Sequence, residues 1–190
     1  MVRAFHLLCK LNSYKLSDKA LFYAFMSKTD LVHMTCPCCG SRGNHAVYSS
    51  YERSMISFEE GVRRDSIVSI PRIKCHCGHT HAVLPDVLIP YGSYSLRFIL
   101  TVLFCYLTRR VTVEELCSKF QIVKSTLYSW IHLFIEHFNL LAGILKSIDS
   151  LKLDALEWIR SFDGISHEFY NRFKFSFLQP HHVTTHCYTT

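Results

Sequence analysis

The sequence is poor in charged residues, and the acidic ones are the scarcer kind. Charged residues make up 19% of the 190 residues, with 15 Asp and Glu against 21 Lys and Arg. Disordered chains combine low hydrophobicity with high charge, so a chain with 49% hydrophobic residues is not of that class. The net charge of +6 suits a polyanionic partner but does not require one.

Long hydrophobic runs are also missing. The longest apolar run, Phe98–Leu107, reaches about half of the roughly 20 residues that a membrane-spanning helix needs. Met1–Leu11 holds one Arg among interrupted apolar residues, which argues against a secretory signal. We therefore expect a cytoplasmic protein without a membrane partner. In such a protein, closely grouped cysteines indicate metal binding rather than disulfides.

Two cysteine groups flank a stretch with strand character. The first is Thr35–Gly40, sequence TCPCCG, and the second is Lys74–Gly78, sequence KCHCG. Between them, β-branched and aromatic residues alternate roughly with polar ones. This pattern predicts strands over Ala46–Phe58 and Val62–Ile73, with a turn at Glu59–Gly61. A cysteine pair, a β-hairpin and a second cysteine pair form the plan of a zinc ribbon.

The predicted cofactor is Zn²⁺, which prefers four soft ligands in a tetrahedron. The predicted ligands are Cys36, Cys39, Cys75 and Cys77. The second loop is one residue shorter than the usual C-x-x-C, so the ligand set stays open. Cys38 or a nearby histidine could replace one cysteine; the histidines are His76, His79 and His81. If zinc binds, it would supply much of the folding energy of so small a β unit. A redox role for the vicinal pair Cys38 and Cys39 is a further alternative.

The segment Thr112–Phe134 has the pattern of a helix-turn-helix. Thr112 and Glu115 form a T-x-x-E capping box for a first helix, and Gln121–Val123 predicts a short turn. Apolar residues then recur at helical spacing and give the second helix a core face: Leu127, Trp130 and Ile131. An ordinary helical hairpin has similar spacing, but the pair of arginines just before the motif favours DNA binding.

The exposed side of the second helix would face base edges in the major groove. Its predicted contact residues are Lys124, Ser125, Tyr128, Ser129 and His132. Basic residues beside it would contact phosphates, namely Arg109, Arg110 and Lys119. Two positions depart from the usual motif. Gln121 stands where glycine usually adopts a positive φ, and Val123 stands where serine or threonine usually caps the helix.

The predicted fold class is α+β, in four segments. Residues 1–33 form an N-terminal helical segment in which Ser17 or Asp18 caps a helix. Residues 34–90 form the ribbon and an extended, proline-containing linker. Residues 91–148 form a three-helix unit whose supporting helix covers Ser93–Arg110, capped by Ser93 or Ser95, and whose long recognition helix continues to about Ile148. Residues 149–190 form a helical or irregular tail.

The tail offers three features with competing interpretations. Aromatic and basic residues interleave over Phe162–Phe177, and they either stack on single-stranded bases or, as we favour, pack one face of a helix. The histidines and cysteine after Pro180 either bind a metal or belong to an unstructured terminus, which we favour. We interpret the carboxylates as solvated charges: Asp149, Asp154, Glu157, Asp163 and Glu168. A short helix is expected over Asp149–Arg160.

Several of these motifs together resemble a known family. They are the CPxCG loop at Cys36, the basic strand ending at Cys75, the THAVLP stretch at Thr80–Pro85 and the pair Pro90–Tyr91. With the helix-turn-helix they look like an uncharacterised bacterial domain-of-unknown-function family, similar to the N-terminal zinc-ribbon and helix-turn-helix region of insertion-sequence transposases. The resemblance covers about Cys36 to Leu145. It implies metal-dependent DNA binding connected with mobile elements.

Three functions follow as hypotheses. The first is a zinc-dependent, sequence-specific protein that binds double-stranded DNA. We expect it not to be an enzyme, because a transposase nuclease domain needs about a hundred further residues to place carboxylates around two metal ions. The second is a truncated or split transposase acting with a separate catalytic chain. The third is a zinc-ribbon module that binds another protein. Self-association through the long helix is a further expected contact.

Overall fold

The computed structural model describes residues 3–7, 16–43, 45–145, 162–173 and 175–180. Over these residues the chain has a mixed α/β fold, with a four-stranded sheet in the order β1-β4-β3-β2 and five helices. The strands are β1 (Arg3–Leu7), β2 (His45–Glu59), β3 (Val62–Cys75) and β4 (Thr80–Pro85). None of the described helices is long and apolar enough to cross a membrane.

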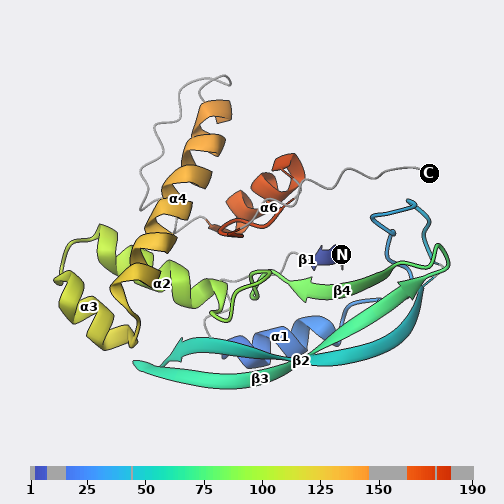
Figure 1. The fold of residues 1–190 in the computed structure, drawn as a ribbon, viewed down its shortest axis with the longest axis horizontal. Coiled ribbons are helices and arrows are strands. Elements are labelled where there is room, and N and C mark those ends of the chain that lie inside the picture. Colours follow the sequence, from blue (N-terminus) through green and yellow to red (C-terminus); the bar gives the residue numbers. More distant parts are fainter. Residues whose placement is uncertain (1–2, 8–15, 44, 146–161, 174, 181–190) are drawn as a thin grey trace.

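The hairpin predicted between the cysteine groups is present as β2 and β3. The two strands pair antiparallel from Glu59 opposite Val62 to His45 opposite Cys75. The connecting residues Glu60 and Gly61 both have positive φ, 53° and 81°, which suits a two-residue hairpin turn whose twist matches that of the strands. The hairpin runs along the whole lower side of the molecule, with the cysteine loops at one end and the helices α3 and α4 near the other (Figure 1).

The segment expected to be a linker is instead part of the sheet. Strand β4 pairs antiparallel with β3, where Ala82 lies opposite Arg72, and parallel with β1. Every residue from 81 to 90 is buried. The linker prediction failed because a strand buried on both faces shows no alternation of polar and apolar residues. Pro85 is tolerated because it is the last residue of its strand.

The N-terminal prediction of helix holds only in part. The helix α1 (Asp18–Met26) is present, and the Ser17 side chain caps it by accepting a hydrogen bond from the Ala20 amide. Residues 3–7, however, form β1 rather than a helix, since they add to the edge of β4. Pairing with a strand some 80 residues away cannot be read from local helical spacing.

The remaining helices follow in the expected order. They are α2 (Leu96–Leu107), α3 (Val113–Phe120), α4 (Lys124–Leu145) and α6 (Phe162–Phe173). Ser95 is the cap of α2, one of the two candidates from the sequence. The expected helix over Asp149–Arg160, the residues around Ile148 and the histidine-rich end after Pro180 lie outside the described residues.

An aromatic cluster joins the hairpin to the helices. Phe98 of α2 lies 6.0 Å from Phe58 of β2, 5.7 Å from Phe120 of α3 and 6.1 Å from Trp130 of α4, between ring centroids. These distances are within the range at which aromatic pairs attract one another. The core of the helical unit is therefore continuous with that of the sheet.

The second aromatic group lies between α4 and α6. Phe169 and Phe177 are buried and pack on the ring of His137, whose Nδ1 accepts a hydrogen bond from the Leu178 amide at 2.9 Å. These aromatic residues thus pack in the core, as favoured from the sequence. Among the carboxylates of this region, Glu168 forms an ion pair with Arg172 on the surface of α6.

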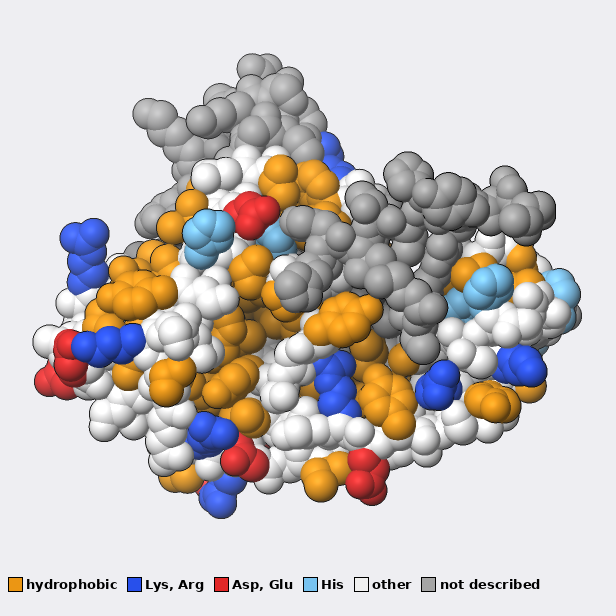
Figure 2. Space-filling model, in the orientation of Figure 1, with side chains coloured by type: hydrophobic (Ala, Val, Ile, Leu, Met, Phe, Trp, Pro, Cys, Tyr) orange, Lys and Arg blue, Asp and Glu red, His pale blue; other side chains and the backbone are white. Residues whose placement is uncertain are grey.

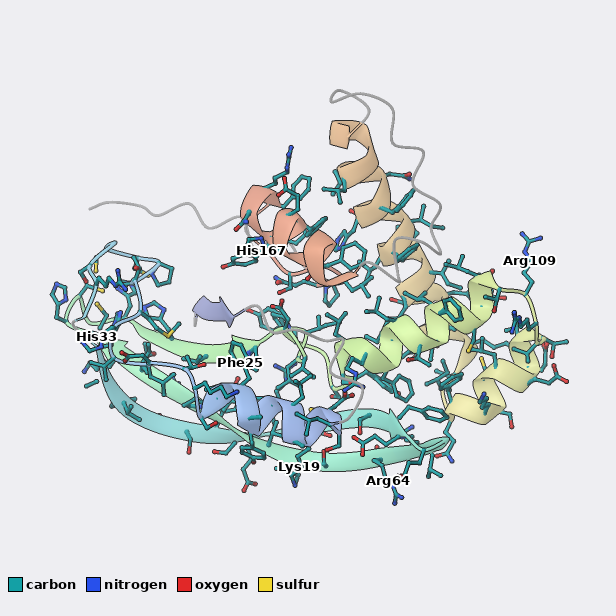
Figure 3. The ribbon with its side chains drawn as sticks, turned by 180° about the vertical axis from the view of Figure 1, so that it is seen from behind. Lys19, Phe25, His33, Arg64, Arg109 and His167 are labelled. Atoms are coloured by element: carbon teal, nitrogen blue, oxygen red, sulfur yellow. The ribbon has the colours of Figure 1, made fainter. Side chains whose placement is uncertain are left out.

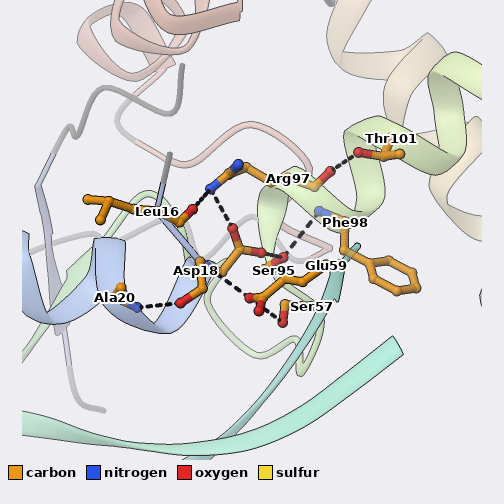
Figure 4. A network of polar contacts seen from close by, with 10 residues as sticks. Leu16, Asp18, Ala20, Ser57, Glu59, Ser95, Arg97, Phe98 and Thr101 are labelled. Atoms are coloured by element: carbon orange, nitrogen blue, oxygen red, sulfur yellow. Dashed lines mark hydrogen bonds and ion pairs between the residues drawn. The ribbon is translucent and has the colours of Figure 1, made fainter. Parts of the chain in front are cut away.

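A buried polar network connects α1, α2 and the hairpin (Figure 4). The Asp18 carboxylate is bonded by the Ser95 hydroxyl and lies 3.0 Å from the Arg97 guanidinium. The Asp18 amide donates to Glu59 at the end of β2, and Arg97 also donates to the Leu16 carbonyl. Burial raises the pKa of Asp18, while the Ser95 hydrogen bond and the Arg97 charge oppose that shift.

Candidate functional site

The first cysteine loop is a tight turn built around Cys36. The Cys36 carbonyl accepts a hydrogen bond from the Gly40 amide at 2.9 Å, and the Cys36 sulfur lies 3.4 Å from the Cys38 amide nitrogen, which donates to it. Gly40 has a φ of 71°, a conformation that glycine adopts at little cost. The turn leaves the sulfurs of Cys36 and Cys39 on the same side, toward the second loop.

The second cysteine loop is the turn between β3 and β4. Its ends are fixed by the sheet, because Lys74 and Thr80 form the last strand pair. The Gly78 amide donates to the Cys75 carbonyl at 2.9 Å, and Gly78 has a φ of 86°. The short C-x-C spacing is therefore accommodated by a strand-to-strand turn, which brings Cys77 back beside Cys75.

The two loops bring four cysteine sulfurs to within 4.8 Å of one another: Cys36, Cys39, Cys75 and Cys77. The Cys36 and Cys77 sulfurs are 3.8 Å apart, and those of Cys39 and Cys75 are 3.6 Å apart. A tetrahedron with metal–sulfur bonds of about 2.3 Å has edges of about 3.8 Å, whereas a disulfide bond is only about 2.05 Å long. The spacing therefore fits a metal ion.

The electrostatics of the cluster also favour a bound cation. Hydrogen bonding by the Ser41 side chain lowers the pKa of the Cys39 thiol to about 6, whereas burial raises the pKa of Cys36. Four sulfurs this close cannot all ionise unless a positive charge lies among them. The arrangement thus has the chemistry of a closed, thiolate-rich metal site, which is typical of structural rather than catalytic centres.

The alternative ligands lie around the four cysteines. His76 and His79 are exposed, and their Nδ1 atoms are each 3.5 Å from the neighbouring sulfurs of Cys75 and Cys77. His81 is fully buried, with its Nε2 3.4 Å from the Cys36 sulfur. Figure 3 shows His33 and the sulfur atoms together at this end of the molecule.

The second candidate site is the helix pair α3 and α4. The expected capping box is present, since the Thr112 hydroxyl accepts from the Glu115 amide and the Glu115 carboxylate accepts from the Thr112 amide. Gln121 adopts a left-handed conformation, with φ 51° and ψ 50°. The first helix therefore ends at Phe120, and a three-residue turn with buried Ile122 leads into α4.

All the residues predicted to contact DNA are exposed. On α4 they are Lys124, Ser125, Tyr128, Ser129 and His132, and beside it they are Arg109, Arg110 and Lys119. By contrast, the predicted core residues Leu127 and Trp130 are buried, and Ile131 is half-buried. The register of α4 thus separates the two faces as expected from helical spacing.

The start of α4 has no side-chain cap. The carbonyl of Val123 accepts from the amides of Thr126 and Leu127, but its own apolar side chain is 64% exposed. An ordinary capping residue would satisfy one of the first free amides of the helix. Val123 therefore occupies the capping position of α4 without a side chain that can accept a hydrogen bond, which differs from the usual helix-turn-helix motif.

One comparison with known families covers both sites. The model of a domain of unknown function, DUF6431, matches residues 36–130, from the first cysteine of the cluster to the buried tryptophan of α4. The chain belongs to the DUF6431 family. No curated protein and no solved structure matches it. The DUF6431 region therefore contains both cysteine loops, the hairpin, α2, α3 and the first two turns of α4.

The charges around the helix pair of this DUF6431 protein are mixed. Lys124 forms an ion pair with Glu114 of α3, and His132 lies 3.9 Å from Glu136 one turn further along α4. Arg109 extends outward from the turn after α2 (Figure 3). Acidic and basic side chains lie next to one another at the α3 end of the face in Figure 2, so this face is not uniformly basic.

Reasoning from the sequence of this DUF6431 protein did not predict two residues that support these sites. Ser41 bonds the Cys39 sulfur at 3.0 Å, and its position directly after the CPxCG loop is the only local signal for that role. Arg63 near the hairpin tip donates to the Gln121 carbonyl at 2.8 Å and so ties the hairpin to the turn between α3 and α4. These residues are 58 positions apart, and no pattern in the sequence connects them.

Proposed function

We propose that this protein is a zinc-dependent, sequence-specific binder of double-stranded DNA, related to transposases and acting by binding rather than by catalysis. The observation that carries the proposal is the left-handed Gln121. It ends α3 and redirects the chain within three residues, so that the start of α4 projects with its polar side exposed. A recognition helix requires this arrangement.

The contacts divide into two kinds. Ser125, Tyr128 and Ser129 offer hydroxyl groups that can donate to or accept from base edges, and these give sequence preference. Arg109, Arg110 and Lys119 surround the helix pair and contact phosphates, which give affinity but no sequence preference. With about three phosphate contacts, the logarithm of the binding constant should fall with the logarithm of salt concentration with a slope of roughly −3.

Zinc has a structural part in this proposal. Four thiolates in a closed tetrahedron leave no position for a substrate, so the ion holds together the cysteine end of the sheet. Among common protein metals, zinc and iron are the two that match a four-sulfur tetrahedron. Elemental analysis of the purified protein measures the metal directly.

The experiment that tests DNA binding starts with selection of bound sequences from a random duplex library, with and without a zinc chelator. We then expect Tyr128→Ala and Lys124→Ala each to weaken binding to the selected site about tenfold, because a base contact is worth about 1–3 kcal/mol. Tyr23→Ala and Lys19→Ala are matched controls, since both residues are exposed on α1, far from α4. Equal affinities for the four variants, or no retained DNA at low salt, would contradict the proposal.

A protein-binding module is the second candidate, and specific observations favour it. Val123 just before α4 and Ile135 on α4 are apolar and more than half exposed, and Lys124 is already paired with Glu114. Such a surface suits a protein partner as well as a duplex. Salt separates the two, because binding through phosphates weakens steeply with salt and binding through apolar side chains does not.

A further inference from the structure

Two potential ligands remain beside the four-cysteine cluster. Cys38 and His81 lie so close to Cys36 that their ligand atoms are all within 4.8 Å of one another. Cys36 is therefore common to two groups, the four cysteines and this set of three. His81 lies on β4 and Cys38 in the first cysteine loop, so the second group connects that loop to the sheet.

The geometry of the second group is that of metal ligands. The His81 Nε2 is 3.4 Å from the Cys36 sulfur. In a tetrahedral site with metal–sulfur bonds of about 2.3 Å and metal–nitrogen bonds of about 2.05 Å, these two atoms would be about 3.6 Å apart. His81 is completely buried, and the strand pairs at Ile73 and Arg3 fix its backbone, so the ring is held at this place without metal.

Charge gives an independent reason. One divalent ion among four thiolates leaves a net charge of about −2 in a partly buried site, which is costly to keep away from water. A second divalent ion with the Cys38 thiolate and a neutral imidazole would reduce that charge to about −1. The second group therefore offers a cation a favourable place next to the first.

We propose that the Cys36 sulfur bridges two thiophilic cations of the zinc class, and that Cys38 and His81 complete the second site with it. Three protein ligands leave one coordination position of the second ion open to water or to a small thiol or anion. The inference rests on the metal centre of the proposed function but not on DNA binding. The second ion is the weaker one, since its site has fewer ligands.

Metal stoichiometry of the full chain tests the second site. Protein stripped with a chelator is titrated with Cd²⁺, whose sulfur charge-transfer absorption reports each bound equivalent. We expect two equivalents per chain, the second bound at least tenfold more weakly. Cys38→Ser and His81→Gln should each remove the second equivalent and retain the first. The matched controls Cys105→Ser on α2 and His167→Gln on the exposed side of α6 should retain both, since neither residue belongs to a ligand group of the described residues.

The outcomes are separable. Saturation at one equivalent overturns the second site and leaves the four-cysteine centre intact, whereas no bound metal overturns both. Two equivalents that persist in Cys38→Ser and His81→Gln also overturn the inference, because the second ion then lies elsewhere. If His81→Gln fails to fold, Cys38→Ser decides alone, since Cys38 is half-exposed outside the sheet. Two ¹¹³Cd resonances with mutual coupling would support the bridging sulfur.

Discussion

The two ends of the β2–β3 hairpin are held together in different ways. At the cysteine end the buried apolar cluster is small, with Ile73 and Val83 at its centre. At the other end, residues of the hairpin pack with α2, α3 and α4 into a large continuous core around Phe98. The first end has four clustered cysteines that could hold a metal ion where the second has side-chain packing, and a small β unit buries little apolar surface to fold by packing alone.

This difference teaches that one sheet can combine two sources of stability that respond to different perturbations. Removing a metal acts on the cysteine end, and removing a core side chain acts on the helical end. The Asp18 network and the Arg63–Gln121 hydrogen bond are two of the polar links between the hairpin and the helices. The comparison therefore predicts that metal removal destabilises mainly the cysteine end and that truncation of a core side chain destabilises mainly the helical end.

The largest effect is expected from Cys36→Ser. Structural zinc contributes about 10–16 kcal/mol of apparent binding free energy in small zinc domains, and three remaining ligands cannot close the tetrahedron. We expect loss of the metal and loss of hydrogen-exchange protection in the loops and the adjoining ends of β2, β3 and β4. The amides of α3 and α4 should keep their protection. A metal-free variant that remains protected at the cysteine end would contradict this comparison.

Trp130→Ala should have the opposite distribution. Trp130 is 8% exposed and packs on Phe98 and Tyr94, so its truncation should cost about 3–5 kcal/mol in the free energy of unfolding. The metal content should remain near that of the wild type. Chemical denaturation followed by circular dichroism measures the loss, and Tyr128→Ala, an exposed aromatic two residues away, is the control. Equal destabilisation by both variants would mean that the register of α4 is wrong.

Asp18→Ala should have an intermediate effect, at the place where α1 and the start of α2 meet the tip of the hairpin. The change leaves the Ser95 hydroxyl and the Arg97 guanidinium without their carboxylate partner, at a cost of about 1–3 kcal/mol. Asp30→Ala is the control, because Asp30 is exposed and its bonds to His33 and to the Val32 amide lie on the surface. Equal thermal stability of Asp18→Ala and Asp30→Ala would contradict a stabilising role of the network at the helical end.

The smallest effect is expected from Gln121→Gly. A residue with a Cβ pays about 1–2 kcal/mol in the left-handed conformation, and glycine recovers most of it while losing some chain entropy. We expect stabilisation of about 0.5–1 kcal/mol by denaturation. Gln121→Ala keeps the Cβ and should give no gain. The backbone carbonyl that Arg63 contacts is unchanged in both variants, so neither loses that hydrogen bond.

Local patterns in the sequence predicted much of this molecule. Alternating residues gave the hairpin, helical spacing gave α2, α3 and α4, and the spacing of cysteines in two loops gave the cluster of four. Each of these signals lies within a few residues of the structure that it specifies. Because the capping box at Thr112 is also local, the start of α3 could be placed to the residue.

The features that escaped prediction depend on partners distant in the sequence. Strand β1 is defined by pairing with β4, and the sequence predicts a linker in place of β4 because burial on both faces removes the alternating pattern. The position of His81 follows from that strand, so the sequence predicted it only as one of three histidines that could replace a cysteine and not as the one beside Cys36. Arg63 was missed because the chain must first fold back along the hairpin to reach Gln121.

The length of the hairpin has a consequence for any complex with a duplex. Strand β3 has 14 residues, which span at most about 46 Å at about 3.3 Å per residue. The hairpin thus holds its cysteine end and the turn before α4 at a fixed separation. If both touched one duplex, at about 3.4 Å per base pair, they would do so about 13 base pairs apart. A nuclease footprint of that length, shortened by a chelator at one end only, would be the mark of such a complex.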